Sequence, residues 1–126
     1  MDCKKVAKAT TKVISSYLTY QAVQAVLEQL TETNPPLALW LRSFSGRSIV
    51  QDGEVYLLAL LVENQELAFR IMTVREYLVE EIMDDLPEML FHEIKLKNSQ
   101  HRKQQLEKLS QLSVTEPRLN FESSSE

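Results

Sequence analysis

The chain has 126 residues, of which 44% are hydrophobic and 25% are charged, and its formal net charge is −4. This composition is typical of a single ordinary globular domain, and the acidic balance disfavours nucleic acid as a partner. The only cysteine, Cys3, excludes an intramolecular disulfide and a thiolate-rich metal site.

No segment of the sequence has the length or apolarity of a membrane anchor. The longest apolar run, residues 55–62, is far shorter than the ~20 residues that a transmembrane helix needs. The first residues, Met1 to Lys5, lead into no apolar signal core. We therefore expect a cytoplasmic protein with no membrane partner and no transit peptide.

The first predicted helix runs from about Lys4 to Thr33, where apolar residues recur at helical spacing. Tyr17 and Tyr20 lie one turn apart in it and project side by side. Two interpretations of this pair stay open: two core aromatics, or an exposed recognition surface, because tyrosine offers a rigid apolar ring and a hydroxyl. Four lysines near the amino terminus are typical of a solvated helix face: Lys4, Lys5, Lys8 and Lys12.

Two shorter helices are predicted next. Asn34 and Pro35 suit the start of a helix that continues to Phe44, and Gly46 suits its end. Asp52 suits the start of a third helix. Residues 55–62 of that helix are apolar all round, so we expect it to be the central buried element.

A fourth, long helix is predicted from Asn64, a suitable N-cap, to Leu112. At 1.5 Å per residue, about 45 helical residues extend ~65–70 Å, whereas a compact chain of this length has a radius of gyration of roughly 14 Å. Pro87 lacks an amide proton and predicts a bend near residues 83–86. Residues 113–126 lack apolar periodicity, so we expect one helical domain over residues 1–112 followed by a disordered tail.

The apolar face of the long helix, from Leu67 to Ile94, is longer than three short helices can cover. A second copy of the chain packed along this face would bury the excess. The sequence therefore predicts an all-α, four-helix protomer that forms a homodimer along its long helix.

Nothing in the sequence predicts an enzyme, a cofactor or a metal site. His92 and His101 do not have metal-ligand spacing on one helix, and two isolated glycines cannot form a phosphate-binding loop. A di-metal enzyme would need Glu-x-x-His pairs, and Glu88 with His92 is one residue too widely spaced. Metal analysis of the purified protein would test that alternative. We expect the acidic residues of this region to form a solvated helix face: Glu76, Glu80, Glu81, Asp84, Asp85, Glu88 and Glu93.

Four ordered strings carry a resemblance to a known family. They are YLTYQAV at 17–23, LTETNPPLALWL at 30–41, QDGE at 51–54 and LAFRIMTVRE at 67–76. LPEM at 86–89 and HRK at 101–103 extend the match. Over about residues 6–112 the chain resembles RbcX, the Rubisco assembly chaperone, and strings of this length are far more specific than a short motif.

The resemblance implies an arc-shaped homodimer with the long, kinked last helix as its seam. It also implies a central groove for the carboxyl-terminal peptide of the Rubisco large subunit, lined by Tyr17, Tyr20, Val50 and Gln51. A second, peripheral polar surface for the folded large subunit is implied at Gln29, Glu32, Asn34 and Arg70.

A protein of this kind would clamp large-subunit dimers and promote assembly of the large-subunit core. Association with carboxysomes stays open. The alternative is a generic dimeric helical adaptor without chaperone activity, which would not need two tyrosines directed at a groove. A pull-down with the large-subunit terminal peptide would separate the two hypotheses.

Overall fold

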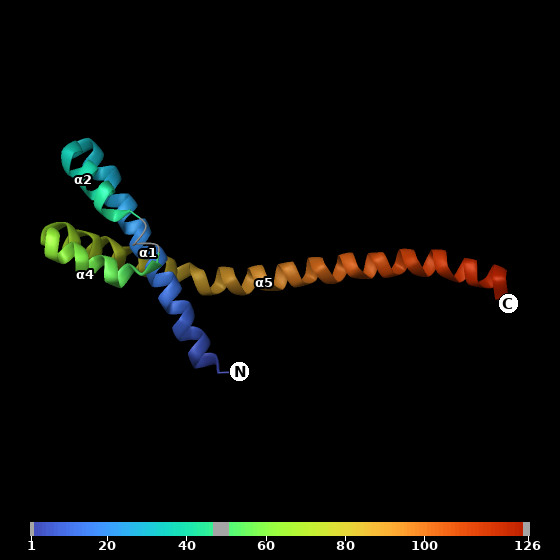
Figure 1. Cartoon of the computed structure of the whole chain (residues 1–126). Helices are drawn as coiled ribbons and strands as arrows, with labels where there is room; N and C mark the ends of the chain where they lie inside the picture. The colour runs from blue at the N-terminus through green and yellow to red at the C-terminus, as the bar shows by residue number, and fades with distance from the viewer. Residues whose placement is uncertain (1, 47–50, 125–126) are drawn as a thin grey trace. The chain divides into compact units, whose positions relative to one another are not determined.

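The computed structural model describes residues 2–46 and 51–124, with side chains described as far as Leu112. Four α-helices make up this part of the chain (Figure 1): α1, Cys3–Thr33; α2, Pro35–Ser45; α4, Gly53–Glu63; and α5, Gln65–Ser124. No strand occurs among the described residues. The prediction of an all-α, four-helix protomer is confirmed.

The three later helices start at the capping residues that the sequence predicts. Asn34 Oδ1 accepts a hydrogen bond from the Leu37 N–H at 3.3 Å, and Asn64 Oδ1 accepts one from the Leu67 N–H at 3.1 Å. The Asp52 carboxylate caps α4 in the same way, because its Oδ1 accepts a hydrogen bond from the Glu54 N–H at 3.0 Å. These bonds satisfy amide groups that have no partner within their own helix, so short polar signals fix where each helix begins.

Helix α2 carries the predicted apolar face. Leu41 is fully buried, and Trp40 stacks on Phe44 with 5.2 Å between the ring centroids. The Phe44 ring also lies 5.8 Å from the Tyr56 ring, which joins α2 to α4. Gly46 ends the helix with a φ of 38°, a conformation that favours glycine.

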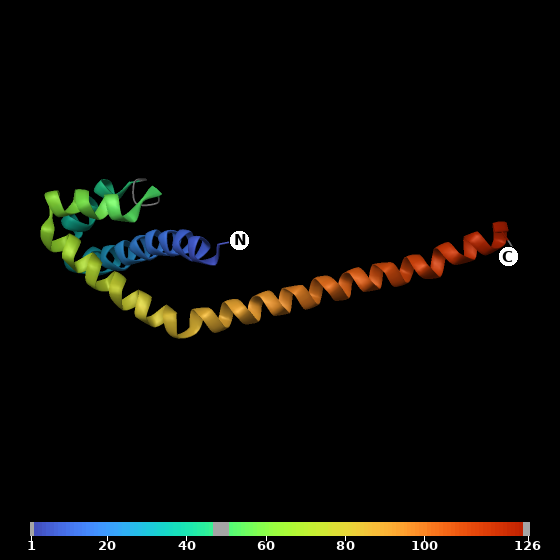
Figure 2. The same ribbon diagram turned by 90° about the horizontal axis from the view of Figure 1, so that it is seen from below.

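The chain divides into two compact units, Met1–Met83 and Asp84–Glu126. Helix α5 begins in the first unit and continues into the second. In the first unit α2 and α4 both pack against α1, and the turn at Asn64 leads from α4 into α5 (Figure 2). The bend that Pro87 predicts lies close to the boundary between the two units and stays a prediction.

The hydrophobic core of the first unit is built on the second half of α1. Its buried residues come from all four helices: Ala22, Val23, Val26, Leu27, Leu30, Ala38, Leu41, Tyr56, Leu57, Leu60, Leu67, Ala68 and Ile71. The Tyr56 hydroxyl lies 2.7 Å from the Ser45 hydroxyl, so this buried polar group has a hydrogen-bond partner. Burial raises the pKa of the Tyr56 phenol, and the hydrogen bond between Tyr56 and Ser45 opposes that shift.

The prediction that α4 is the central buried element is wrong. Tyr56, Leu57 and Leu60 are buried on one side of the helix. The other side exposes three large apolar residues: Val55, Leu58 and Val62. Because an uninterrupted apolar run has no polar face, its sequence does not indicate which side meets the core. The central place belongs to the middle of α1.

Helix α5 continues to Ser124, beyond the predicted end at Leu112. The sequence between these residues contains no glycine that would end a helix. The description of residues 113–124 concerns the backbone alone. The disordered tail in solution and the domain limit at residue 112 stay predictions.

Candidate functional site

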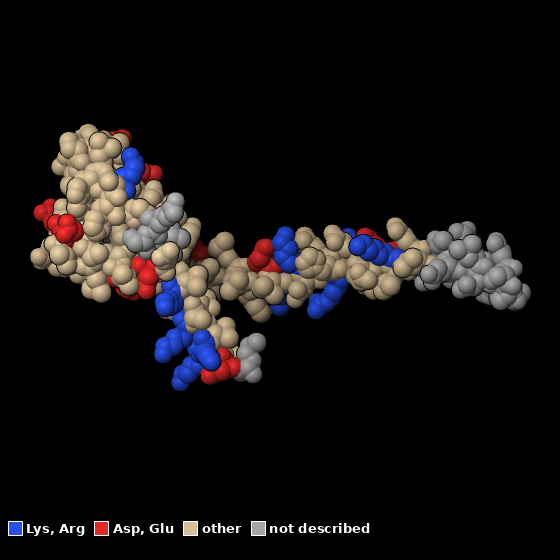
Figure 3. All heavy atoms as spheres, viewed as in Figure 1, with Lys and Arg blue, Asp and Glu red and all other residues tan. Residues whose placement is uncertain are grey.

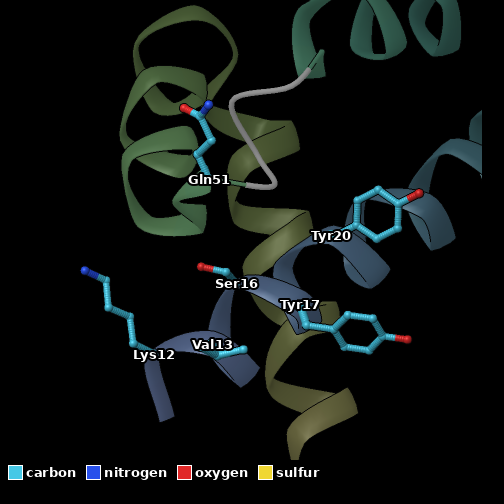
Figure 4. Close-up of a pocket in the computed structure, with 6 residues that line it drawn as sticks. All are labelled: Lys12, Val13, Ser16, Tyr17, Tyr20 and Gln51. Carbon is cyan, nitrogen blue, oxygen red and sulfur yellow. The ribbon is translucent and has the colours of Figure 1, made fainter. Parts of the chain in front are cut away.

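The two groove tyrosines predicted from the sequence face a hollow of about 520 Å³ in the first unit (Figure 4). Its lining consists of Lys12, Val13, Ser16, Tyr17, Tyr20 and Gln51. All except Gln51 belong to α1, and Gln51 lies just ahead of α4. A hollow of this size can receive apolar side chains of a bound peptide.

Tyr17 and Tyr20 are 61% and 37% exposed, so the interpretation of this pair as core aromatics is wrong for the single chain. Their rings extend to the same side of α1 in Figure 4. Together they form an apolar wall that ends in two hydroxyls. Val50 lies outside the described residues, so three of the four predicted groove residues line this hollow.

A polar junction beside the hollow ties three helices together, and the sequence analysis did not find it. We use this name for Ser15, Ser16, Thr19, Gly53, Glu54 and Arg75. The Gly53 N–H donates a hydrogen bond to Ser16 Oγ at 3.1 Å. Arg75 Nη1 donates to the Glu54 carboxylate at 2.6 Å and to the Thr19 hydroxyl at 3.0 Å. The Ser15 hydroxyl donates to the same carboxylate, also at 3.0 Å.

This junction holds the amino-terminal end of α4 against α1 and α5. In the described part of the chain, Arg75 with Glu54 is the only ion pair. The two residues are 21 positions apart, and no helical spacing relates them. The available signal was the unusual run of serines and threonines on the polar side of α1, but its partners became identifiable only once the helices were packed.

Gly53 is the position in the junction where a side chain has no space. An added Cβ would lie 2.8 Å from Thr19 Oγ1 and 3.2 Å from Ser16 Cα. Because the second contact is with backbone, it cannot be relieved by a rotamer change. We expect Gly53→Ala to lower the free energy of unfolding by about 1–3 kcal/mol, the usual cost of overpacking.

Urea unfolding monitored by circular dichroism would measure this loss. Leu58→Ala, at an exposed position on the opposite side of the same helix, is the control and should change stability by less than ~0.5 kcal/mol. Equal midpoints for Gly53→Ala and the wild type would contradict the close contact between α4 and α1.

Two of the four predicted peripheral residues contact each other directly. Arg70 Nη2 donates a hydrogen bond to Gln29 Oε1 at 2.5 Å. Glu32 and Asn34 are exposed on the same end of α1 and the turn after it, and the Asn34 side chain also caps α2. We call these four residues the peripheral patch. Gln29 lies ~18 Å from Tyr17 along the helix axis, so the patch and the hollow are separate surfaces.

The acidic residues between positions 76 and 93 are all exposed in the single chain, as the predicted solvated face requires. Within residues 2–46 and 51–124, no three His, Cys, Asp or Glu side chains converge as a metal ion would require. The Lys95 ammonium group, close to His92 in the sequence, lies over the Phe91 ring, 4.6 Å from its centroid. None of the helices described has the length and apolarity needed to span a membrane.

These features define an all-α protein that carries an aromatic hollow and a separate polar patch on packed helices. Comparison with known proteins identifies the family. A family model described as RbcX protein matches residues 1–111. The chain belongs to the RbcX family.

Several members of this family are closely similar to this chain. RuBisCO chaperone RbcX of Anabaena sp. (strain CA) is 53% identical over 117 residues, which cover 93% of this chain and 86% of that protein. RuBisCO chaperone RbcX of Thermosynechococcus vestitus is 55% identical over 113 residues, which cover 90% of each chain. A crystal structure of RbcX in complex with substrate has a TM-score of 0.77 at 50% identity, covering 87% of this chain and 99% of that chain. The resemblance stated from the sequence is thus confirmed, and these relatives are named as chaperones, not as enzymes.

Proposed function

We propose that this chain is a non-enzymatic Rubisco assembly chaperone that binds the carboxyl-terminal peptide of the Rubisco large subunit at Tyr17 and Tyr20. The observation that carries the proposal is an exposed tyrosine pair at an apolar hollow in a chain of the RbcX family. The relatives named RuBisCO chaperone RbcX, and the RbcX solved in complex with substrate, support it.

The chemistry of the hollow suits an extended peptide. Such a peptide offers apolar side chains together with unpaired backbone amide and carbonyl groups. The rings of Tyr17 and Tyr20 supply apolar surface, while their hydroxyls and the Gln51 amide supply hydrogen-bond partners. Val50 is included in the proposed groove on the resemblance alone.

The proposal includes a homodimer that completes the groove. Leu86, Leu90 and Ile94 recur every four residues along α5 and therefore form one apolar stripe. Leu90 and Ile94 are 57% and 53% exposed in the single chain. Monomeric proteins rarely expose a continuous stripe of this kind, and pairing with a second copy would bury it.

The peripheral patch is proposed to contact the folded body of the large subunit. Arg70 presents several donors in a fixed plane, and its hydrogen bond to Gln29 restricts how the guanidinium points. Polar contacts at the edge of an interface favour rapid exchange, which a chaperone needs in order to release its client. We place this action in the cytoplasm, where the exposed thiol of Cys3 would stay reduced.

Two measurements test the proposed function. Calorimetric titration with the terminal peptide of the large subunit should give saturable binding. Reconstitution of the large-subunit core should give more assembled product with the protein than without it. A chain that binds no peptide and leaves the yield unchanged would be a generic adaptor instead.

The peripheral patch is tested by Arg70→Ala. Peptide affinity should stay unchanged, because the substituted side chain lies on a different surface from the hollow. The contact with the folded subunit should weaken by about tenfold or more, since losing a charge-assisted hydrogen bond costs ~1.5–3 kcal/mol. Lys108→Ala, which removes an exposed cation of α5 outside the patch and the hollow, should assemble Rubisco as the wild type does. Normal assembly with Arg70→Ala would remove the patch from the mechanism.

A further inference from the structure

The amino-terminal half of α1 carries a lysine row that the proposed function does not use. The row consists of Lys4, Lys5, Lys8 and Lys12, and residues 3–27 contain no aspartate or glutamate. All four lysines are exposed, and basic atoms gather at this end of α1 in Figure 3. The single ion pair of the described chain joins other residues, so these ammonium groups have no carboxylate partner there.

The lysine row leads into the tyrosine hollow. Lys12 itself lines the hollow beside Val13 and Ser16. At about 100° per helical residue, Lys5, Lys8 and Lys12 fall within a sector of about 60°. They therefore form one basic track along α1 that reaches the hollow at Lys12, about 80° around the helix from Tyr20.

We propose that the lysine row binds carboxylate groups of the same peptide that places an apolar side chain in the tyrosine hollow. The inference rests on the proposed function, because it concerns the same bound peptide. It assigns that peptide a class: an extended segment with an apolar anchor and acidic residues on one side of it. Charge complementarity supports this occupant, since Lys12 lines a hollow that has no acidic residue, and the other three lysines continue the row without a carboxylate partner among the described residues.

The helix geometry gives the spacing of those carboxylates. Along the axis of α1, Lys12 lies ~7.5 Å and Lys4 ~20 Å from Tyr17. An extended peptide advances ~3.4 Å per residue. Acidic side chains about two to six residues from the anchor would therefore lie over the lysine row.

A large polyanion fits the row less well than a short acidic peptide. The whole chain has a net charge of −4, so nucleic acid or an anionic membrane would be repelled outside this row. A peptide a dozen residues long would meet only the row and the hollow. The remaining alternative is a row that is solvated and binds nothing.

The test uses two peptides and two variants of the full chain. One peptide is the carboxyl terminus of the Rubisco large subunit, and the other has every Asp and Glu replaced by Asn and Gln. The wild type should bind the acidic peptide about fivefold more tightly than its amide counterpart, as expected for two or three exposed ion pairs. Lys8→Gln/Lys12→Gln should lose most of that preference, and raising the salt concentration should do the same.

Matched controls separate the possible outcomes. Lys103→Gln/Lys108→Gln removes two exposed lysines of α5 and should keep the preference. Tyr17→Ala should weaken both peptides by the same factor. A wild type that binds both peptides equally, at any salt concentration, would overturn the lysine assignment and leave the proposed function intact. A wild type that binds neither peptide would overturn both. Lysine-dependent binding of duplex DNA or of phosphatidylserine vesicles, without a peptide preference, would also overturn the assignment in favour of a polyanion site.

Discussion

A Leu90→Glu/Ile94→Glu variant is expected to be a monomer under conditions in which the wild type is a dimer. Each of these exposed side chains would contribute about 1.5–3 kcal/mol to a dimer that buries it. Replacing both with carboxylates removes that contribution and places charge in the interface, so the dissociation constant should rise by more than ~100-fold. Light scattering at several protein concentrations measures the mass directly.

The residues for this test come from the structure. Ile71 belongs to the apolar face that predicted the dimer, but it is fully buried in the core of its own chain. A charge at Ile71 would unfold the protomer and report nothing about its partner. Val62→Glu is the control, because Val62 is 82% exposed on α4 and lies outside the α5 stripe. A wild-type monomer at micromolar concentration, or a dimeric double variant, would contradict the proposed seam.

The starts of α2, α4 and α5 could be predicted because they depend on local chemistry. Asn34, Asp52 and Asn64 each accept hydrogen bonds from amide groups two or three residues further along the chain. A contact of such short range is visible in the sequence itself. The end of α2 at Gly46 is also visible in the sequence, because a positive φ is favourable for glycine whatever its neighbours are.

Buried faces were harder to predict because burial depends on which helices meet. Apolar residues keep helical spacing throughout α1, yet Val6 and Val13 are exposed and the core begins at Leu18. Periodicity indicates a face that can be buried, whereas the length of the neighbouring helices decides how much of it is covered. In α4 the apolar run was continuous, so even the direction of the buried face was undetermined.

The residues of the candidate site also differ in whether the sequence could predict that they lie together. Tyr17 and Tyr20 share a face because they lie on one helix, so their juxtaposition followed from spacing. Gln29 and Arg70 are 41 positions apart, and only the resemblance to RbcX placed them on one surface. The polar junction could be predicted neither from helical spacing nor from the resemblance. Its Glu54 and Arg75 are brought together by the packing of α4 and α5 on α1.

Tyr20→Ala is expected to lose at least ~30-fold in affinity for the large-subunit terminal peptide. Truncating a central aromatic contact commonly costs 2–4 kcal/mol at a peptide-binding or protein interface. The fold should survive, because Tyr20 is not among the core residues and α1 keeps its buried side chains. Calorimetry gives the affinity, while circular dichroism and light scattering check helicity and mass on the same sample.

Tyr20→Phe separates the ring from the hydroxyl. It keeps the apolar wall and removes one hydrogen-bonding group, so its loss should stay near the 0.5–1.5 kcal/mol of a typical neutral hydrogen bond, or about two- to tenfold. Tyr77→Ala removes a tyrosine of α5 that is exposed but does not line the hollow, and it should bind as the wild type does. If Tyr20→Ala stays folded and keeps the affinity of Tyr77→Ala, the peptide does not bind at the tyrosine hollow, and the groove must be sought on another face of the protein.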